Sequence, residues 1–159
     1  VYNNTPIVTV ILDNRITGMT VHQENPGSGK TLQNEPAPMV DIESLVVSCG
    51  VKKENIRVVD PYKLKETEDA VKDAHNSKEP FVIVTKQPCA LIKEVLKKRA
   101  NFSCKVDSEK CKKCKKCLKT GCPALKFQNG IVSIDESLCN GCGLCKEVCP
   151  FDAIEKVGE

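Results

Sequence analysis

Cysteines near the C-terminus form the clearest chemical pattern in this chain. Eight of the eleven cysteines fall into two runs, Cys111-x2-Cys114-x2-Cys117-x4-Cys122 and Cys139-x2-Cys142-x2-Cys145-x3-Cys149. A proline follows each run. Three closely spaced thiolates followed by Cys-Pro are typical of [4Fe–4S] proteins. The pattern therefore predicts two such clusters and one-electron redox chemistry.

The ligands of each cluster follow from the crossed arrangement of paired runs, in which the fourth cysteine of one run reaches the other cluster. The expected ligands are Cys111, Cys114, Cys117 and Cys149 for cluster one, and Cys122, Cys139, Cys142 and Cys145 for cluster two. The extra residue in the first run predicts a local bulge at Gly121. Gly141 and Gly143 are expected to let the second loop turn closely and offer N–H groups to sulfur.

Other uses of cysteine fit this pattern less well than iron–sulfur clusters. Disulfide frameworks are typical of small secreted domains, and no signal-peptide pattern opens this chain. Structural zinc is the sharper alternative, but zinc motifs use separated Cys-x2-Cys pairs without a third close cysteine. Cys49 is expected in the core, and Cys89 either packs, which is the preferred interpretation, or faces a cofactor cleft. The spacing of Cys104 fits neither run, so it is not counted as a ligand.

The remaining residues predict an α/β domain. Apolar strand patterns occupy Ile7–Leu12, Ile56–Val59 and Phe81–Val84, and helical patterns occupy Asp41–Cys49, residues 62–76 and Ala90–Arg99. Such alternation implies a parallel sheet covered by helices, with ligands at the carboxyl ends of the strands. The first strand is apolar throughout and is expected to be buried on both faces. Asp41 is the expected N-cap of its helix and Gly50 its stop; Leu64, Val71 and Ala74 are expected on one face of the second helix.

The cysteine module is expected to contain a small hairpin. Two short apolar runs, Leu125–Gln128 and Ile131–Ile134, flank Asn129-Gly130, which is a strong hairpin-turn signal. The expected division is therefore residues 1–102, the C-terminal part of an α/β domain, and residues 103–159, a ferredoxin-like α+β domain. No apolar run approaches the ~20 residues that span a bilayer. Reduced cysteines and the lack of an export signal favour the cytoplasm.

A long segment without strand or helix pattern follows Leu12. Long irregular segments in compact domains are often functional, although an ordinary surface loop is the alternative. Residues Gly27–Thr31 look like the tail of a phosphate-binding P-loop, but the motif requires glycine at position 24, which is Glu24. A P-loop is therefore excluded.

The same segment resembles a known family. Val8–Gln23, read with Pro26–Lys30, is similar to the diphosphate-binding part of thiamine diphosphate (TPP) enzymes. More narrowly, it resembles the large (alpha) subunit of 2-oxoacid:ferredoxin oxidoreductases of the indolepyruvate type. Pro88–Leu91 and the two cysteine runs continue the resemblance in the same order, so that it covers nearly the whole chain.

The resemblance implies roles for individual residues. The Asn14 side chain and the Ile16 carbonyl would coordinate the Mg²⁺ that bridges the cofactor diphosphate, since this hard cation prefers oxygen ligands. The residues expected to bind the cofactor are Asp13, Asn14, Ile16, Thr17, Gly18, Met19 and Thr20. His22 and Gln23 would lie towards the substrate as catalytic candidates. The alternatives are that Asn14 caps a turn and that His22 is an ordinary exposed histidine.

One departure concerns the metal site. TPP enzymes carry Gly-Asp-Gly upstream of the strand that ends at the magnesium-binding Asn, and its Asp is the other protein ligand. No Gly-Asp-Gly precedes Asp13 here. The chain is therefore expected to be the C-terminal part of a larger subunit, to hold half of the metal site, and to be inactive alone.

The implied reaction is oxidative decarboxylation of a 2-oxoacid such as an arylpyruvate. Coenzyme A takes the acyl group, electrons pass through the two clusters to an external ferredoxin, and a second (beta) subunit is the expected partner. The alternative is a stand-alone double-cluster electron-transfer protein with a non-catalytic α/β appendage. With 4% aromatic residues and no stacking motif, nucleic-acid binding is not expected.

Lysines crowd around the first cysteine run, although the net charge of the chain is only +3. They are Lys105, Lys110, Lys112, Lys113, Lys115, Lys116 and Lys119. A basic face of this kind would steer an acidic ferredoxin towards the clusters. Equally, the lysines could form a solvated face that offsets the negative charge of thiolate-bound clusters.

Overall fold

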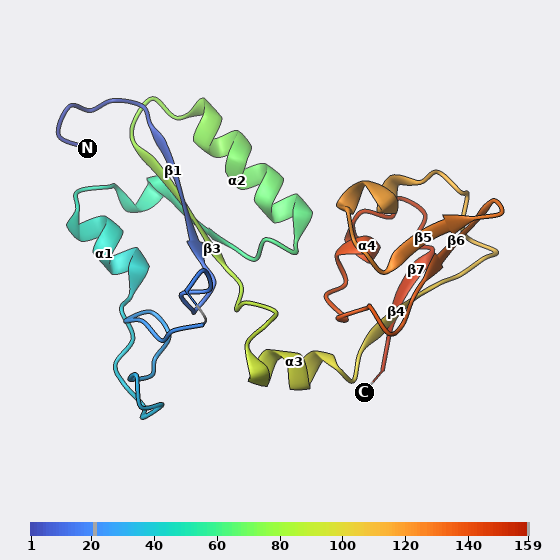
Figure 1. Ribbon diagram of the computed structural model, residues 1–159. Coiled ribbons are helices and arrows are strands. Elements are labelled where there is room, and N and C mark those ends of the chain that lie inside the picture. The colour runs from blue at the N-terminus through green and yellow to red at the C-terminus, as the bar shows by residue number, and fades with distance from the viewer. Residues whose placement is uncertain (21, 159) are drawn as a thin grey trace. The chain divides into compact units, whose positions relative to one another are not determined.

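The structure, a computed structural model, describes residues 1–20 and 22–158 and divides into two compact units, Val1–Ile92 and Lys93–Glu159 (Figure 1). The expected domain boundary between residues 102 and 103 lies after helix α3 (Lys93–Arg99), which this division places in the second unit. None of the helices in the described ranges is both long enough and apolar enough to cross a membrane.

The first unit contains a parallel sheet with strand order β1-β3-β2. Its elements are β1 (Val8–Asp13), α1 (Ile42–Ser48), the 3-10 helix η1 (Lys53–Asn55), β2 (Ile56–Val59), α2 (Leu64–Asn76) and β3 (Phe81–Lys86). Asp13 pairs with Lys86 and Val59 with Thr85, so all these strands end at one edge of the sheet. The expected parallel α/β sheet is confirmed.

The central strand β3 presents alternate side chains to two helices. Phe81 and Ile83 pack in one cluster with Ala70 and Ala74 of α2. Val82 and Val84 belong to a second cluster that includes Val46 of α1 and Val51 beyond it. Because β1 to β2 steps across the sheet and β2 to β3 steps back, right-handed crossovers place the two helices on opposite faces (Figure 1).

Helix α1 begins and ends where the sequence predicts. The Asp41 carboxylate accepts a hydrogen bond from the Glu43 N–H at 3.1 Å and another from the Ser44 hydroxyl at 2.6 Å, which satisfies the helix start. Cys49 is the C-cap, and Gly50 follows with φ of 93°, a conformation that glycine adopts without strain.

Three packing expectations are wrong. Strand β1 is not buried on both faces, since Val8, Val10 and Leu12 are exposed; it lies at the edge of the described sheet with β3 as its one neighbour. On α2 the buried side chains are Ala70 and Ala74, which are four residues apart, whereas Val71 lies one position round the helix and is exposed. Cys49 is exposed instead of lying in the core, because it follows the last turn of α1. Helix α3 also begins at Lys93 instead of Ala90.

Replacing Ile83 with alanine is expected to lower the free energy of unfolding of the first unit by about 3 kcal/mol. The side chain is 2% exposed between the sheet and α2, so truncation leaves a cavity. Urea unfolding followed by tyrosine fluorescence measures this unit, because Tyr2 and Tyr62 are the only tyrosines. The control is Leu12→Ala, where the side chain is 74% exposed and the change should stay within about 0.5 kcal/mol. Equal losses for the two variants would contradict this account of the core.

The second unit is built from two antiparallel ribbons and short helices. After α3 come β4 (Ser103–Val106), the 3-10 helix η2 (Lys116–Thr120), β5 (Leu125–Gln128), β6 (Ile131–Ile134), α4 (Leu144–Glu147) and β7 (Ile154–Val157). The predicted β5–β6 hairpin is confirmed, with Asn129 and Gly130 at φ of 52° and 76°, as a type I′ turn requires. The second ribbon pairs β4 with β7 and was not anticipated.

Candidate cofactor sites

The predicted ligands of cluster one surround one cavity of the second unit. Cys111, Cys114, Cys117 and Cys149 line it together with apolar side chains that include Val106 of β4 and Val132 of β6. The fourth cysteine of the second run thus lies with the first three of the first run.

The predicted ligands of cluster two surround a second cavity. Cys122, Cys139, Cys142 and Cys145 line it, and the fourth cysteine of the first run lies with the first three of the second run. Among the described residues, no three His, Cys, Asp or Glu side chains converge as a site for a single ion. A four-iron cube binds four separated thiolates, so these residues fit that group. The individual ligand assignments stay predictions that this crossed arrangement supports.

Backbone turns position the second set of thiols. Gly141 has φ of 64°, and a Cβ there would come within 2.6 Å of the Phe102 carbonyl oxygen, so that a larger residue is excluded. The Asn140 side-chain oxygen accepts a hydrogen bond from the Cys142 N–H at 3.2 Å. In the first run the extra residue is accommodated by η2, whose C-cap is Gly121 with φ of 69°. A 3-10 turn therefore replaces the simple bulge that was expected there.

Burial opposes ionisation of the deepest thiols. Burial raises the pKa of Cys117, and burial together with neighbouring cysteines, Cys104 first, raises the pKa of Cys145 to about 12. A cluster would be held by thiolates, so iron would have to displace the protons of Cys117 and Cys145 on binding. The positive charge of bound iron would then stabilise the buried thiolates in place of the solvent that they lack.

A third cavity, of about 250 Å³, lies at the carboxyl edge of the parallel sheet in the first unit. Its lining comes from the ends of all three strands and comprises Leu12, Asp13, Asn14, Pro61, Tyr62, Thr85, Gln87, Pro88, Cys89 and Ala90. Backbone hydrogen bonds hold this edge together, from the Gln87 N–H to the Asp13 carbonyl at 3.1 Å and from the Cys89 N–H to the Asn14 carbonyl at 2.9 Å. The strands thus end where ligands of such sheets are expected.

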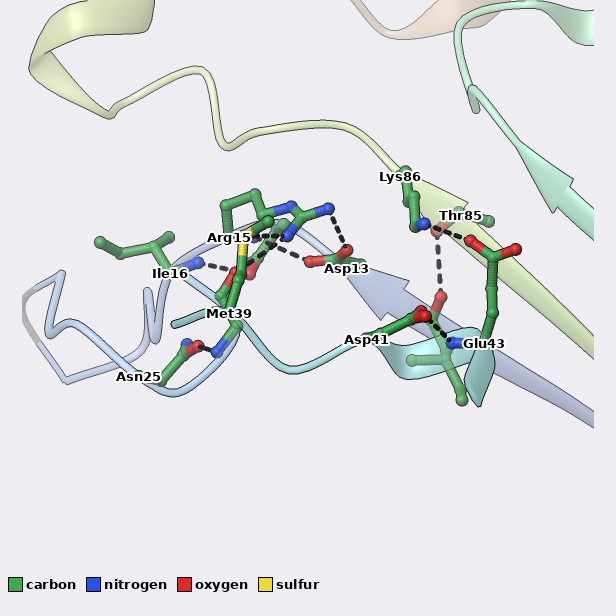
Figure 2. Close-up of polar contacts among 12 residues, drawn as sticks. Asp13, Arg15, Ile16, Asn25, Met39, Asp41, Glu43, Thr85 and Lys86 are labelled. Carbon is green, nitrogen blue, oxygen red and sulfur yellow. Dashed lines mark hydrogen bonds and ion pairs between the residues drawn. The ribbon is translucent and has the colours of Figure 1, made fainter. Parts of the chain in front are cut away.

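Asp13 brings a buried negative charge to this edge. The residue is 7% exposed, and its Oδ1 accepts a hydrogen bond from the Arg15 N–H at 3.3 Å. Its Oδ2 lies 3.1 Å from Arg15 Nη2 as an ion pair, but no hydrogen bond reaches this oxygen among the described residues. Arg15 is itself anchored by the Gly27 carbonyl at 3.0 Å and by the Met39 sulfur (Figure 2). Asp13 therefore retains an oxygen able to accept a further ligand.

Asn14 has the turn-capping role that was given as the alternative, and its metal-binding role stays a prediction. Its Oδ1 accepts a hydrogen bond from the Ile16 N–H at 3.1 Å, so it caps the turn after β1. A carboxamide oxygen has a second lone pair, which remains able to bind a cation. The donor set at this edge is therefore carboxylate and amide oxygen, which suits Mg²⁺. On this chemistry the residues fit a magnesium-bound diphosphate.

The other predicted cofactor residues lie in a turn beyond the cavity. Thr17 and Gln23 exchange backbone hydrogen bonds of 3.0 and 3.1 Å, and the Thr20 hydroxyl lies 2.8 Å from Gln23 Oε1. Met19 is 98% exposed, and Gly18 and His22 are also exposed. Ile16 is buried at the base of this turn. The structure does not bring the side chains of residues 17–20, 22 and 23 to the cavity, and their roles stay predictions.

Sequence reasoning missed several residues of these cavities. Tyr62, Thr85 and Gln87 line the cavity of the first unit, and their signal was their position at or just after a strand end. Cys89 lines the same cavity, which favours the cleft interpretation over packing. Cys104 is buried beside the cysteines of the second run and lines their cavity.

Comparisons with known proteins agree with both sites. Residues 1–85 match the family "Thiamine pyrophosphate enzyme, C-terminal TPP binding domain", and residues 132–155 match "4Fe-4S binding domain". The second match covers Cys139, Cys142, Cys145 and Cys149.

Curated relatives match almost the whole chain. "Indolepyruvate oxidoreductase subunit IorA" of Archaeoglobus fulgidus is 42% identical over 98% of this chain and 25% of its own length. The proteins of the same name from Pyrococcus abyssi and Methanothermobacter marburgensis are 38% and 35% identical over all of this chain, again over 25% of their own lengths. The chain thus spans about a quarter of these relatives and is homologous to them throughout. With its first 85 residues matched, the chain belongs to the thiamine pyrophosphate enzyme family and carries the C-terminal TPP-binding domain beside a 4Fe-4S binding domain.

Proposed function

We propose that the chain provides TPP-binding residues and the electron outlet of an indolepyruvate-type 2-oxoacid:ferredoxin oxidoreductase. The observation that carries the proposal is the combination, in one chain, of an oxygen-lined cavity at the strand ends with two four-cysteine cavities. In the reaction a 2-oxoacid and coenzyme A give acyl-CoA, CO₂, one proton and two electrons. Two ferredoxins take these electrons one at a time through the clusters.

The proposed roles follow the chemistry of each group. The Asn14 side chain and the Ile16 carbonyl would hold Mg²⁺. Asp13 adds a negative charge at this edge of the sheet and forms an ion pair with Arg15. When bound, TPP supplies the electron sink that loss of CO₂ requires. Cys111, Cys114, Cys117 and Cys149 hold one cluster, and the other four cysteines of the runs hold the second. A cytoplasmic setting keeps all eight thiols reduced.

The decisive experiment compares the 159-residue chain with a full-length IorA-type subunit that contains it, paired with its second (beta) subunit. Each is given TPP, Mg²⁺, coenzyme A, an arylpyruvate and oxidised ferredoxin under anaerobic conditions. We expect substrate-dependent ferredoxin reduction from the full assembly and none from the chain alone. Robust turnover by the isolated chain would refute the expectation that the site is shared. Failure of the assembly to bind TPP, with clusters present, would instead favour a plain electron-transfer protein.

Lysines at the first cavity are proposed to steer ferredoxin. Lys112, Lys115 and Lys116 line this cavity, whereas Lys105 and Lys110 form ion pairs with Glu136 and Glu155. Changing both Lys112 and Lys116 to glutamate is expected to raise the KM for ferredoxin about tenfold at low salt with little change in kcat. The difference should shrink as ionic strength rises, because salt screens exposed charges.

The matched control for this steering prediction reverses two lysines of α3, Lys97 and Lys98, which line neither cysteine cavity. The control carries the same change in net charge and should leave the KM within about twofold of the parent. An equal rise in KM for both variants would show that overall charge, and not this face, controls the encounter.

A further inference from the structure

Strands β4 and β6 each contribute one side chain to each of the two cysteine cavities. On β4, Val106 lines the first cavity and Cys104 the second; on β6, Val132 lines the first and Ile134 the second. Residues two apart on a strand share a face, so each strand offers one side chain to each cavity. On β6 both are aliphatic, whereas on β4 the second cavity receives a thiol. The second cavity is therefore lined by a fifth cysteine.

Cys104 is among the most buried side chains described, at 1% exposure. Its side chain lines the same cavity as Cys139 and Cys145, which are both predicted ligands of cluster two. Four thiolates complete the ligation of a cube, and Cys122, Cys139, Cys142 and Cys145 already supply them. The fifth thiol is then left next to the cluster with its S–H available.

A thiol beside cluster sulfur has a defined electrostatic effect. S–H is a weak hydrogen-bond donor, and hydrogen bonds to cluster sulfurs help to set the reduction potential. Each cluster gains one negative charge when it takes an electron, so a donor stabilises the reduced form more than the oxidised form. A valine in the same place, as at Val106, offers no donor.

We propose that Cys104 is a non-ligand positioning residue that donates a hydrogen bond to sulfur of cluster two and raises the reduction potential of that cluster. This inference rests on the cluster assignment of the proposed function. It gives cluster two a hydrogen-bond donor on β4 at the position where the first cavity has Val106.

The test uses the full chain loaded anaerobically with iron and inorganic sulfide. Three variants are compared with the parent: Cys104→Val, Cys104→Ser and Val106→Cys. Iron content counts the clusters, and redox titrations followed by EPR and by the contact-shifted β-protons of the ligand cysteines report each cluster separately. These readouts do not depend on turnover.

In Cys104→Val we expect full iron content and a reduction equilibrium of cluster two that is about two- to tenfold less favourable, as loss of one hydrogen bond predicts. Tenfold corresponds to about 59 mV for a one-electron couple. Cluster one should not shift. Cys104→Ser keeps a hydrogen-bond donor and should restore most of the reduction potential that cluster two loses in Cys104→Val. Val106→Cys should raise the potential of cluster one by a similar factor.

Two outcomes would overturn the inference. Loss of half the iron in both Cys104→Val and Cys104→Ser would make Cys104 a ligand, and unchanged potentials in Cys104→Val and Val106→Cys would leave it a packing residue. If the Cys104 variants fail to fold, Val106→Cys is the deciding variant. An unchanged reduction potential of cluster one in that variant would then refute the inference. A parent chain that forms no [4Fe–4S] cluster would instead refute the proposed function itself.

Discussion

Replacing Cys149 with serine is expected to remove cluster one and leave cluster two, although Cys149 belongs to the second cysteine run. Cys149 lines the cavity of Cys111, Cys114 and Cys117, so its loss opens that site. Roughly four of roughly eight iron atoms should be lost. The reciprocal change, Cys122→Ser, should remove cluster two, because Cys122 lines the cavity of the second run.

Iron and sulfide analysis gives the number of clusters, and EPR of the reduced protein shows which cluster remains. The matched control is Cys49→Ser, a thiol that is exposed at the end of α1 and lines neither cysteine cavity. It should retain all the iron. If Cys149→Ser instead removed the cluster held by Cys139, Cys142 and Cys145, each run would serve its own cluster and the crossed assignment would be wrong.

In the second unit, the sequence predicts the features that depend on neighbouring residues and misses those that depend on distant ones. The cysteine spacings and the Asn129-Gly130 turn involve residues close together in the chain, so the sequence reveals both. The β4–β7 ribbon pairs residues at opposite ends of the unit, Ser103 with Val157, and short strands so far apart carry no local signal. The spacing of Cys104 fits neither cysteine run, so the sequence does not reveal its place beside the second cavity, which depends on the β4–β7 pairing.

In the first unit, too, the sequence predicts where strands and helices lie but not how deeply they are buried. Local patterns located its strands and the caps of α1, since β-branched runs, Asp41 and Gly50 act on their immediate neighbours. Burial of β1 could not be predicted, because it depends on which strands lie beside it. The cavity was predicted in place but not in full composition: Asn14 was found by resemblance, whereas Tyr62 and Gln87 reach the edge through pairing of the three strands.

Replacing Asn14 with alanine is expected to weaken binding of TPP and Mg²⁺ by about 100-fold, at the upper end of losses seen for groups that support a metal. The change removes the one side-chain amide oxygen that Asn14 offers at this edge of the cavity. Calorimetric titration of a full-length IorA-type subunit containing this sequence measures the affinity. The control is Gln33→Ala in the same irregular segment, because Gln33 is exposed and does not line the cavity.

Three further substitutions separate the cation-binding role of Asn14 from its role in capping the turn. Aspartate keeps oxygen for both the Ile16 N–H and Mg²⁺, so Asn14→Asp should retain most of the affinity. Serine can still close a turn of this kind but is shorter, so Asn14→Ser should keep the fold and lose the metal. Raising Mg²⁺ should then partly restore TPP binding to Asn14→Ser, because only metal affinity has been lowered. Recovery of full affinity by serine at low Mg²⁺ would show that Asn14 acts through the turn alone, and Asp13→Asn would then test the remaining carboxylate as the ligand.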